Sequence, residues 1–326
     1  MDNTLASRLH DEGLISAGSV ERIKQRQVGS LFSVHWEIKT LLYLGVLLLT
    51  GGLGILVYKN IDTIGHQFIL LFIALVCIGC FYYCLKNKLP FSVQRVAAPN
   101  MFFDYLLLLG CISFIIFIGY LQYQYNVFGN RYGLASFIPM LLLFFSAYYF
   151  DHLGVLSMGI TNLAAWMGIT VTPMQILKTN DFNSGTIIVT GLVLGALLIA
   201  AGLFTEHKKI KKHFEFTYTN FGVHILFISA LAGMFNFEDI YLLWFLFLAG
   251  IALYFYLKAM KDRSFYLLLV TTLYAYIAFS YVFIRLLDGM GGLNEGILYL
   301  GLIYFIVSGI LLVLFLINAN KKIKSA

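Results

Sequence analysis

The stretch PNMFFDYLLLLGCISFIIFIG, residues 99–119, decides the fold class. From Met101 onward it continues for the roughly 20 residues that an α-helix needs to cross a hydrocarbon core about 30 Å thick. Its charged residue, Asp104, stands near the start of the run, and a carboxylate inside hydrocarbon is costly. The stretch therefore predicts a transmembrane helix, and it makes Asp104 either a functional group or a residue that marks the membrane boundary.

The composition of the whole chain is that of a membrane protein. Of its 326 residues, 60% are hydrophobic and 12% are charged, whereas soluble domains average about 45–50% apolar and about 25% charged residues. A soluble globule with so much apolar surface would aggregate. We therefore expect membrane lipids to surround most of the molecule.

Ten runs of this kind make up the predicted membrane domain. Each is predicted to be a helix, because helices satisfy their own backbone in hydrocarbon and because the runs lack the alternation of barrel strands. The predicted spans are Thr40–Tyr58, Gln67–Leu85, Met101–Tyr123, Tyr132–Phe150, His152–Val171, Thr186–Phe204, Phe216–Phe235, Ile240–Leu257, Ser264–Ile284 and Gly296–Asn318. We expect an all-α, polytopic transmembrane helix bundle at residues 39–326 after a cytoplasmic helical lead at residues 1–38.

The basic residues predict the orientation of these helices. If the N-terminus lies in the cytoplasm, all but four of the 22 lysines and arginines face the inside, which is the distribution that the positive-inside rule describes. The four on the outside are Lys59, Arg131, Lys178 and Arg285. We therefore expect both termini on the inner side, which is also where anionic headgroups attract basic loops.

The weakest join in this topology is YYFDHLGV, residues 148–155, where Asp151 and His152 must form a tight inner turn. Fusing the two flanking runs into one span would remove the charge bias between the two sides. A re-entrant hairpin would instead leave eight spans and the same orientation. Whether Tyr132–Phe150 and His152–Val171 both cross the membrane fully stays open at this point.

The first 38 residues are polar and lack the short apolar core and small-residue cleavage site of a secretory signal peptide. Apolar spacing and capping residues predict two short helices on the inner surface. The segment is too short for the three-helix core of the usual helix-turn-helix DNA reader, so no nucleic-acid partner is expected. Another membrane protein or a second copy of the chain is left open as a partner.

Two quoted stretches carry a family resemblance. HWEIKTLLYLGVLLLTGGLGILVYKNIDTIGHQFILLFI, residues 35–73, has a Trp before a Leu- and Gly-rich span and then an Asn-x-Asp turn. HDEGLISAGSVERI, residues 10–23, has a Gly-Leu-Ile step before a polar helix start. Over roughly the first 100 to 150 residues the chain resembles the bacterial predicted membrane proteins of domain of unknown function 2157. The resemblance implies an integral protein of the bacterial cytoplasmic (inner) membrane and transfers no catalytic residue.

Five polar residues in or near the spans are candidate functional groups: Asp104, His224, Asn162, Asp62 and Tyr276. An acid such as Asp104 in a first helical turn also complements the helix dipole, and a polar turn such as the one that holds Asp62 needs no function. His224 and Asn162 lie near mid-span, where they could relay protons or bond neighbouring helices. Tyr276 belongs to a stripe with Thr272 and Ser280 that could line a water path or contact another helix.

No catalytic motif or metal-ligand spacing accompanies these residues. Cys77, Cys80, Cys84 and Cys111 lie within apolar runs and are expected to fill helix contacts. Gly191 and Gly195 form a G-x-x-x-G pattern that permits close helix packing. We therefore expect no cofactor and favour a non-catalytic structural, sensory or accessory role. A small-solute transporter or channel is the first alternative, and a membrane enzyme acting on lipid or envelope polymer is the second.

Overall fold

The computed structural model describes Glu12, Ser16 and Gly18 together with residues 35–59, 65–171, 185–289 and 295–325. The chain divides into two compact units, Met1–Lys59 and Asn60–Ala326. In the first unit, helix α3 (His35–Lys59) contains the first predicted span and begins four residues before the expected boundary at residue 39. Most of the predicted helical lead at residues 1–38 lies outside the described residues.

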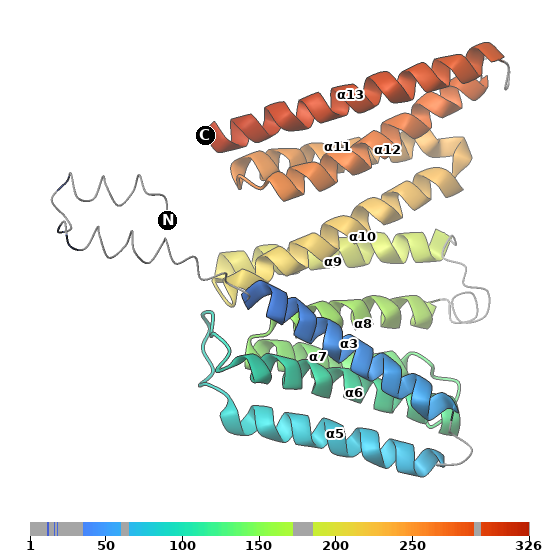
Figure 1. Cartoon of the computed structure of the whole chain (residues 1–326). Coiled ribbons are helices and arrows are strands. Elements are labelled where there is room, and N and C mark those ends of the chain that lie inside the picture. The colour runs from blue at the N-terminus through green and yellow to red at the C-terminus, as the bar shows by residue number, and fades with distance from the viewer. Residues whose placement is uncertain are drawn as a thin grey trace. The chain divides into compact units, whose positions relative to one another are not determined.

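The second unit is built from helices joined by short connections (Figure 1). Its described α-helices are α5 (His66–Asn87), α6 (Met101–Tyr125), α7 (Leu134–Phe150), α8 (Leu153–Val171), α9 (Gly185–Lys208), α10 (Glu215–Asn236), α11 (Tyr241–Lys261), α12 (Phe265–Gly289) and α13 (Glu295–Ser325). Two short 3-10 helices, η2 (Lys212–Phe214) and η3 (Glu238–Ile240), precede α10 and α11.

Each predicted run corresponds to one helix in the part of the chain that the structure describes. Seven of these helices are long and apolar enough to cross a membrane, namely α5, α6 and α9–α13. The apolar stretches Lys39–Ile55, Leu134–Phe150 and Leu153–Gly168 of α3, α7 and α8 are shorter. The all-helical class is thus confirmed, whereas the expected number of ten full spans is not.

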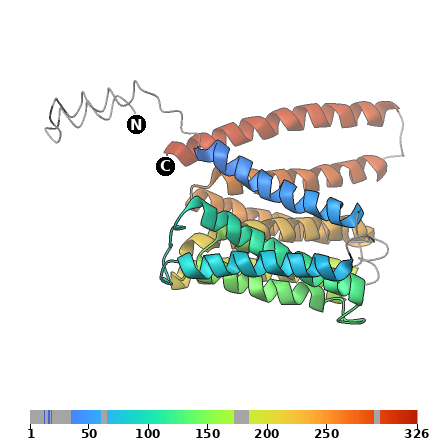
Figure 2. The ribbon, with the colours of Figure 1, turned by 60° about the horizontal axis from the view of Figure 1, so that its bottom comes forward.

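Neighbours in sequence are neighbours in space within the second unit. Successive helices from α5 to α13 pack against one another, and α10 also contacts α8 and α12. Figures 1 and 2 both show the long helices of this unit running side by side, and in Figure 1 α5 and α13 lie at its opposite edges. Short connections between long helices produce this up-and-down order, because each helix must return across the same apolar layer.

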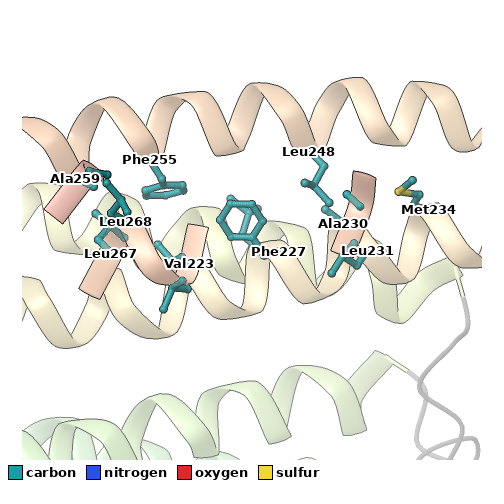
Figure 3. Packing of buried hydrophobic residues seen from close by; sticks show 14 of the residues in the cluster. Val223, Phe227, Ala230, Leu231, Met234, Leu248, Phe255, Ala259, Leu267 and Leu268 are labelled. Carbon is teal, nitrogen blue, oxygen red and sulfur yellow. The ribbon is translucent and has the colours of Figure 1, made fainter. Parts of the chain in front are cut away.

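A cluster of buried apolar residues lies where α10, α11 and α12 meet. Figure 3 shows Phe227, Ala230 and Met234 of α10 facing Leu248 and Phe255 of α11. All five side chains are fully or almost fully buried. Contacts of this kind hold membrane helices together by van der Waals packing, since lipid removes the hydrophobic driving force between helices.

Close approach of α9 and α10 depends on glycine. A Cβ atom added at Gly195 would lie 2.9 Å from the backbone nitrogen of Leu226, and one added at Gly191 would lie 2.1 Å from Ser229 Oγ. Any side chain at Gly195 would therefore push the two backbones apart. The G-x-x-x-G pattern expected to support packing does so inside the chain, between these two helices.

Candidate functional site

Asp104 lies at the end of α6 that meets the start of α8. Asn100 caps this helix by accepting a hydrogen bond from the Phe103 backbone nitrogen at 2.8 Å. Asp104 Oδ1 lies 3.7 Å from His152 Nε2, and His152 Nδ1 accepts a hydrogen bond from the backbone nitrogen of Val155 at 3.1 Å. The carboxylate therefore sits in the first turn of its helix and faces a histidine that caps α8, which is the geometry of a boundary residue.

His224 lies between two tyrosines of α12. Its Nδ1 is 2.8 Å from the hydroxyl of Tyr274, and its Nε2 is 3.1 Å from the hydroxyl of Tyr266. Tyr266 in turn donates to Asn220 Oδ1 at 2.8 Å. The histidine of α10 is thus part of a series of hydrogen bonds that joins two membrane-compatible helices.

The other candidates occupy separate places. The amide of Asn162 donates to the carbonyl oxygen of Met158 in its own helix at 3.1 Å. The Tyr276 hydroxyl lies 3.0 Å from Ser308 Oγ on α13, and Ser280 Oγ lies 3.0 Å from the Tyr304 hydroxyl on the same helix. The polar stripe of α12 therefore contacts another helix. Asp62 lies outside the described residues.

A buried cluster around Asp151 joins three connections at one end of the second unit. Its Oδ2 lies 3.1 Å from Lys211 Nζ and accepts a hydrogen bond from the backbone nitrogen of Val96 at 2.5 Å. Its Oδ1 lies 2.5 Å from His213 Nε2. The side chains of Asp151 and Lys211 are each 1% exposed. The cluster therefore ties the α7–α8 turn to the α5–α6 and α9–α10 connections.

Local backbone geometry brings these charges inward. Asp151 ends α7 with a φ of 60° and Lys211 precedes η2 with a φ of 49°. A short polar side chain such as Asp tolerates this left-handed region better than most residues, whereas Lys does so at a cost. The Lys211 backbone nitrogen donates to the Val93 carbonyl at 2.8 Å, and its Nζ donates to the Gln94 carbonyl at 3.4 Å. Several bonds thus hold the unusual backbone in place.

We call the end of the second unit that holds this cluster the basic end. Figure 1 shows that the α5–α6, α7–α8, α9–α10 and α11–α12 connections and the C-terminus of α13 all lie there. Its described basic residues are Lys86, Lys88, Arg95, Lys208, Lys209, Lys211, Lys212, Lys258, Lys261, Arg263, Lys321 and Lys322. Arg131 and Arg285 lie at the opposite end.

A polar pocket of about 190 Å³ opens toward the basic end between α10, α11 and α12. Its lining includes Asn220, Tyr266 and Lys258. Lys258 Nζ lies 3.5 Å from a carboxylate oxygen of Glu215 and 3.4 Å from one of Asp262. Glu206 adds a third carboxylate at 3.9 Å. Of these charged groups, Glu215, Asp262 and Lys258 line the pocket, so that two acids and one cation lie in its wall.

The basic residues of the opposite end are separated from each other. Arg131 lines a pocket of about 280 Å³ with Trp166 and Thr170. Arg285 instead pairs with Glu238 and lies over the ring of Tyr281. Within the described ranges, no group of three or more His, Cys, Asp or Glu side chains is arranged to hold a metal ion.

The sequence did not indicate the partners of Asp151 or of His224. Lys211 was counted only as a charge of a basic loop and His213 was not singled out, because nothing in the sequence pairs them with Asp151 far upstream. Tyr266 and Tyr274 were not singled out, although their spacing of eight residues places them on one face of α12. The sequence signal that could have identified them is a pair of tyrosines on one face of a helix, together with a histidine in another apolar helix.

Residues 7–156 match the family model described as Predicted membrane protein (DUF2157). We call residues 7–156 the DUF2157 region. The match confirms the resemblance expected over the first 100 to 150 residues. Comparison with curated proteins and with solved structures finds no match.

The DUF2157 region ends within α8, and its limits divide the polar groups. Asp104, Asp151 and His152 fall inside it, whereas Lys211, His213 and His224 lie beyond it. The buried cluster therefore bonds the DUF2157 region to the helices that follow. The family match and the apolar helices together identify a membrane protein, and they indicate no activity.

Proposed function

We propose that this DUF2157 protein is a multi-pass protein of the bacterial inner membrane with both termini in the cytosol, in which all ten apolar helices span the bilayer. We further propose that its role is structural, sensory or accessory and not catalytic. Its immediate partners would be membrane lipids and other membrane proteins, among them a second copy of the chain.

The orientation is supported by the gathering of charge at the basic end. Among the residues whose side chains the structure describes, twelve lysines and arginines of the second unit lie there and two lie at the other end. Positive residues near span ends are retained on the cytosolic side during insertion. The pairing of α7 with α8 and of α8 with α9 supports full crossing by the two shorter helices, because α8 runs alongside α9 (Figure 1).

The observation that carries the non-catalytic proposal is the way polar side chains contact one another across helices. Asp151 meets Lys211, Tyr276 meets Ser308, and Ser280 meets Tyr304. An enzyme site would need a nucleophile with a base, or a metal cluster, gathered around one cleft. These contacts instead lie at separate places, between two connections in the first case and between α12 and α13 in the other two, where they hold the bundle together.

Reporter tags fused to each terminus test the proposed topology. Both tags are expected to be active or protected only on the cytosolic side, and a tag accessible from the periplasm at either end would overturn it. The proposed role is tested by complementation of a deletion phenotype with Asp104→Asn and Tyr276→Phe. Both variants are expected to complement, and failure at a normal membrane level of the protein would indicate that these groups take part in chemistry.

A transporter is the second candidate, and one observation favours it. The series of hydrogen bonds through His224 begins at a polar pocket, as a path for a small ion would. Asp104 and Asn162, the other residues first considered for such a path, have their contacts elsewhere. The support therefore concerns the α10–α12 face alone.

A further inference from the structure

Four polar groups form a continuous series from the pocket at the basic end into the membrane-compatible part of the bundle. Asn220 and Tyr266 line the pocket. The Tyr266 hydroxyl is 2.8 Å from Asn220 Oδ1 and 3.1 Å from His224 Nε2. The hydroxyl of Tyr274 is 2.8 Å from the other ring nitrogen of His224. No step of the series exceeds ordinary hydrogen-bond length.

The hydrogens of this series have a consistent direction. Tyr266 donates its hydrogen to Asn220 Oδ1, so its oxygen is left to accept the Nε2–H of His224. The neutral ring then accepts the Tyr274 hydrogen at Nδ1. Both nitrogens of a neutral imidazole are thus satisfied, and the hydroxyl of Tyr266 separates the ring from the pocket.

His224 lies at an unusual depth along α10 for an ionisable residue. It lies roughly 13 Å along α10 from Glu215, at the rise of an α-helix. An ionisable residue at such a depth is a functional hypothesis by default. The ring of Tyr274 is held in place by Phe227, which stacks on it at a centroid distance of 5.0 Å and an angle of 5°.

We propose that His224 is a proton-loading site that exchanges protons with water in the pocket through the Tyr266 hydroxyl. Loading takes place from the other tautomer of the neutral ring, in which Nδ1 carries the hydrogen and donates it to the Tyr274 oxygen, and in which the Tyr266 hydrogen has turned from Asn220 to Nε2. A hydronium ion in the pocket then gives one proton to the Tyr266 oxygen while the Tyr266 hydrogen passes to Nε2. One water molecule remains in the pocket, and the positive charge moves to the imidazolium. Both ring N–H groups of the imidazolium then donate to the two tyrosine oxygens.

The charges around the pocket favour this uptake. Glu215 of α10 and Asp262 of the α11–α12 turn face Lys258 of α11, and Glu206 of α9 approaches the same ammonium group. Two acids and one cation line the pocket, and negative charge beside a pocket raises the local concentration of cations, protons included. Among the described residues, Tyr266 and Tyr274 are the titratable groups that contact His224 itself.

Protonation requires Tyr274 to turn its hydrogen away from Nδ1. Thr271 lies one helical turn earlier on α12 and is 2% exposed. Its Oγ1 is a buried oxygen with no hydrogen-bond partner among the described residues. A buried unsatisfied hydroxyl is uncommon in native proteins and calls for an explanation. An acceptor that is used only when His224 carries a proton is such an explanation.

NMR of histidine-labelled protein in lipid nanodiscs tests this site. The His224→Gln variant identifies the His224 signals among those of the seven histidines. In the wild type, these signals are expected to change from neutral imidazole to imidazolium as the pH is lowered, with ring protons that exchange with water. The Tyr266→Phe variant is expected to slow this exchange by about tenfold or more, as loss of a proton-transferring group does.

Tyr276→Phe is the matched control, because it removes a tyrosine hydroxyl of the same helix that lies against Ser308 of α13 and not against His224. Its exchange is expected to stay near the wild-type rate. A ring that stays neutral and does not exchange in the wild type would overturn the proposal, and so would Tyr266→Phe exchanging as fast as the wild type. If Tyr266→Phe does not fold, the Asn220→Leu variant and the titration of the wild type still test the proposal.

The proposed topology determines only which side of the membrane the pocket faces, and that side is the cytosol. Nanodiscs expose both ends of the protein to the same buffer, so the NMR result does not depend on orientation. If the terminal tags proved accessible from the periplasm while His224 still titrated, protons would arrive from the other side of the membrane. The proposed proton site itself would remain.

Discussion

The carboxylate of Asp151 and the ammonium of Lys211 lie 3.1 Å apart, each with a side chain 1% exposed. The two residues belong to different connections, and their ion pair fixes the α7–α8 turn against the α9–α10 connection. Removing one partner of a buried ion pair is strongly destabilising. Without Lys211, Asp151 would keep only His213 and the Val96 backbone nitrogen as partners among those described above. This pair is therefore expected to be a principal determinant of stability at the basic end.

Lys211→Met is expected to destabilise the protein by about 3–5 kcal/mol, the usual cost of breaking a buried pair. Asp151→Asn should cost less, because an amide oxygen can still accept the hydrogen bond from the Val96 backbone nitrogen. The double variant should recover part of the loss seen in Lys211→Met, since it leaves no buried charge. Thermal unfolding in a mild detergent or reversible unfolding in bicelles measures these differences.

Asp104→Asn is the control for this series. Its carboxylate is 21% exposed and lies 3.7 Å from His152, so its loss should cost at most about 1 kcal/mol. If Lys211→Met were no less stable than Asp104→Asn, the ion pair would not hold the connections together. Equal stability of Lys211→Met and the double variant would likewise contradict the coupling.

Gly195→Ala is expected to destabilise the contact between α9 and α10. Its new methyl group would lie 2.9 Å from a backbone nitrogen of α10, which cannot move as a side chain can. Overpacking of this kind typically costs about 1–3 kcal/mol. Gly250→Ala is the control, because a Cβ atom there meets nothing within 4 Å. Equal melting temperatures for the two variants would show that the helices separate without cost.

Tyr276→Phe should have a small effect on stability. It removes the hydrogen bond to Ser308 on α13, and such bonds between membrane helices average about 0.6 kcal/mol. Asn162→Leu should be neutral or stabilising, because the amide bonds only within α8 among the contacts described. A large loss in Asn162→Leu would mean that Asn162 makes an interhelical contact or binds a ligand.

The helices could be predicted from sequence with good accuracy. The run predicted at Met101–Tyr123 corresponds to α6 at Met101–Tyr125, and the run at Phe216–Phe235 to α10 at Glu215–Asn236. The turn at Asp151 and His152 was also expected, and α8 begins directly after it at Leu153. Apolar length specifies these elements, because hydrocarbon admits few alternatives to a helix.

The polar contacts could be predicted only in part. Apolar periodicity does not state which helix faces His224, and so Tyr266 and Tyr274 were not expected as its partners. The pairing of Asp151 with Lys211 depends on how two loops fold back over one end of the unit, which no local pattern encodes. The stripe through Tyr276 was predicted as a helix contact or a water path, and its contacts with α13 favour the former.

Cysteine accessibility tests the membrane topology most directly. The four native cysteines are at most 8% exposed, so a membrane-impermeant maleimide should label the wild type weakly. In intact cells, Asn130→Cys at the end opposite the basic end should be labelled from the periplasm, and Lys208→Cys should be labelled only after the inner membrane is permeabilised. Labelling of Lys208→Cys in intact cells, with Asn130→Cys protected, would contradict the proposed orientation.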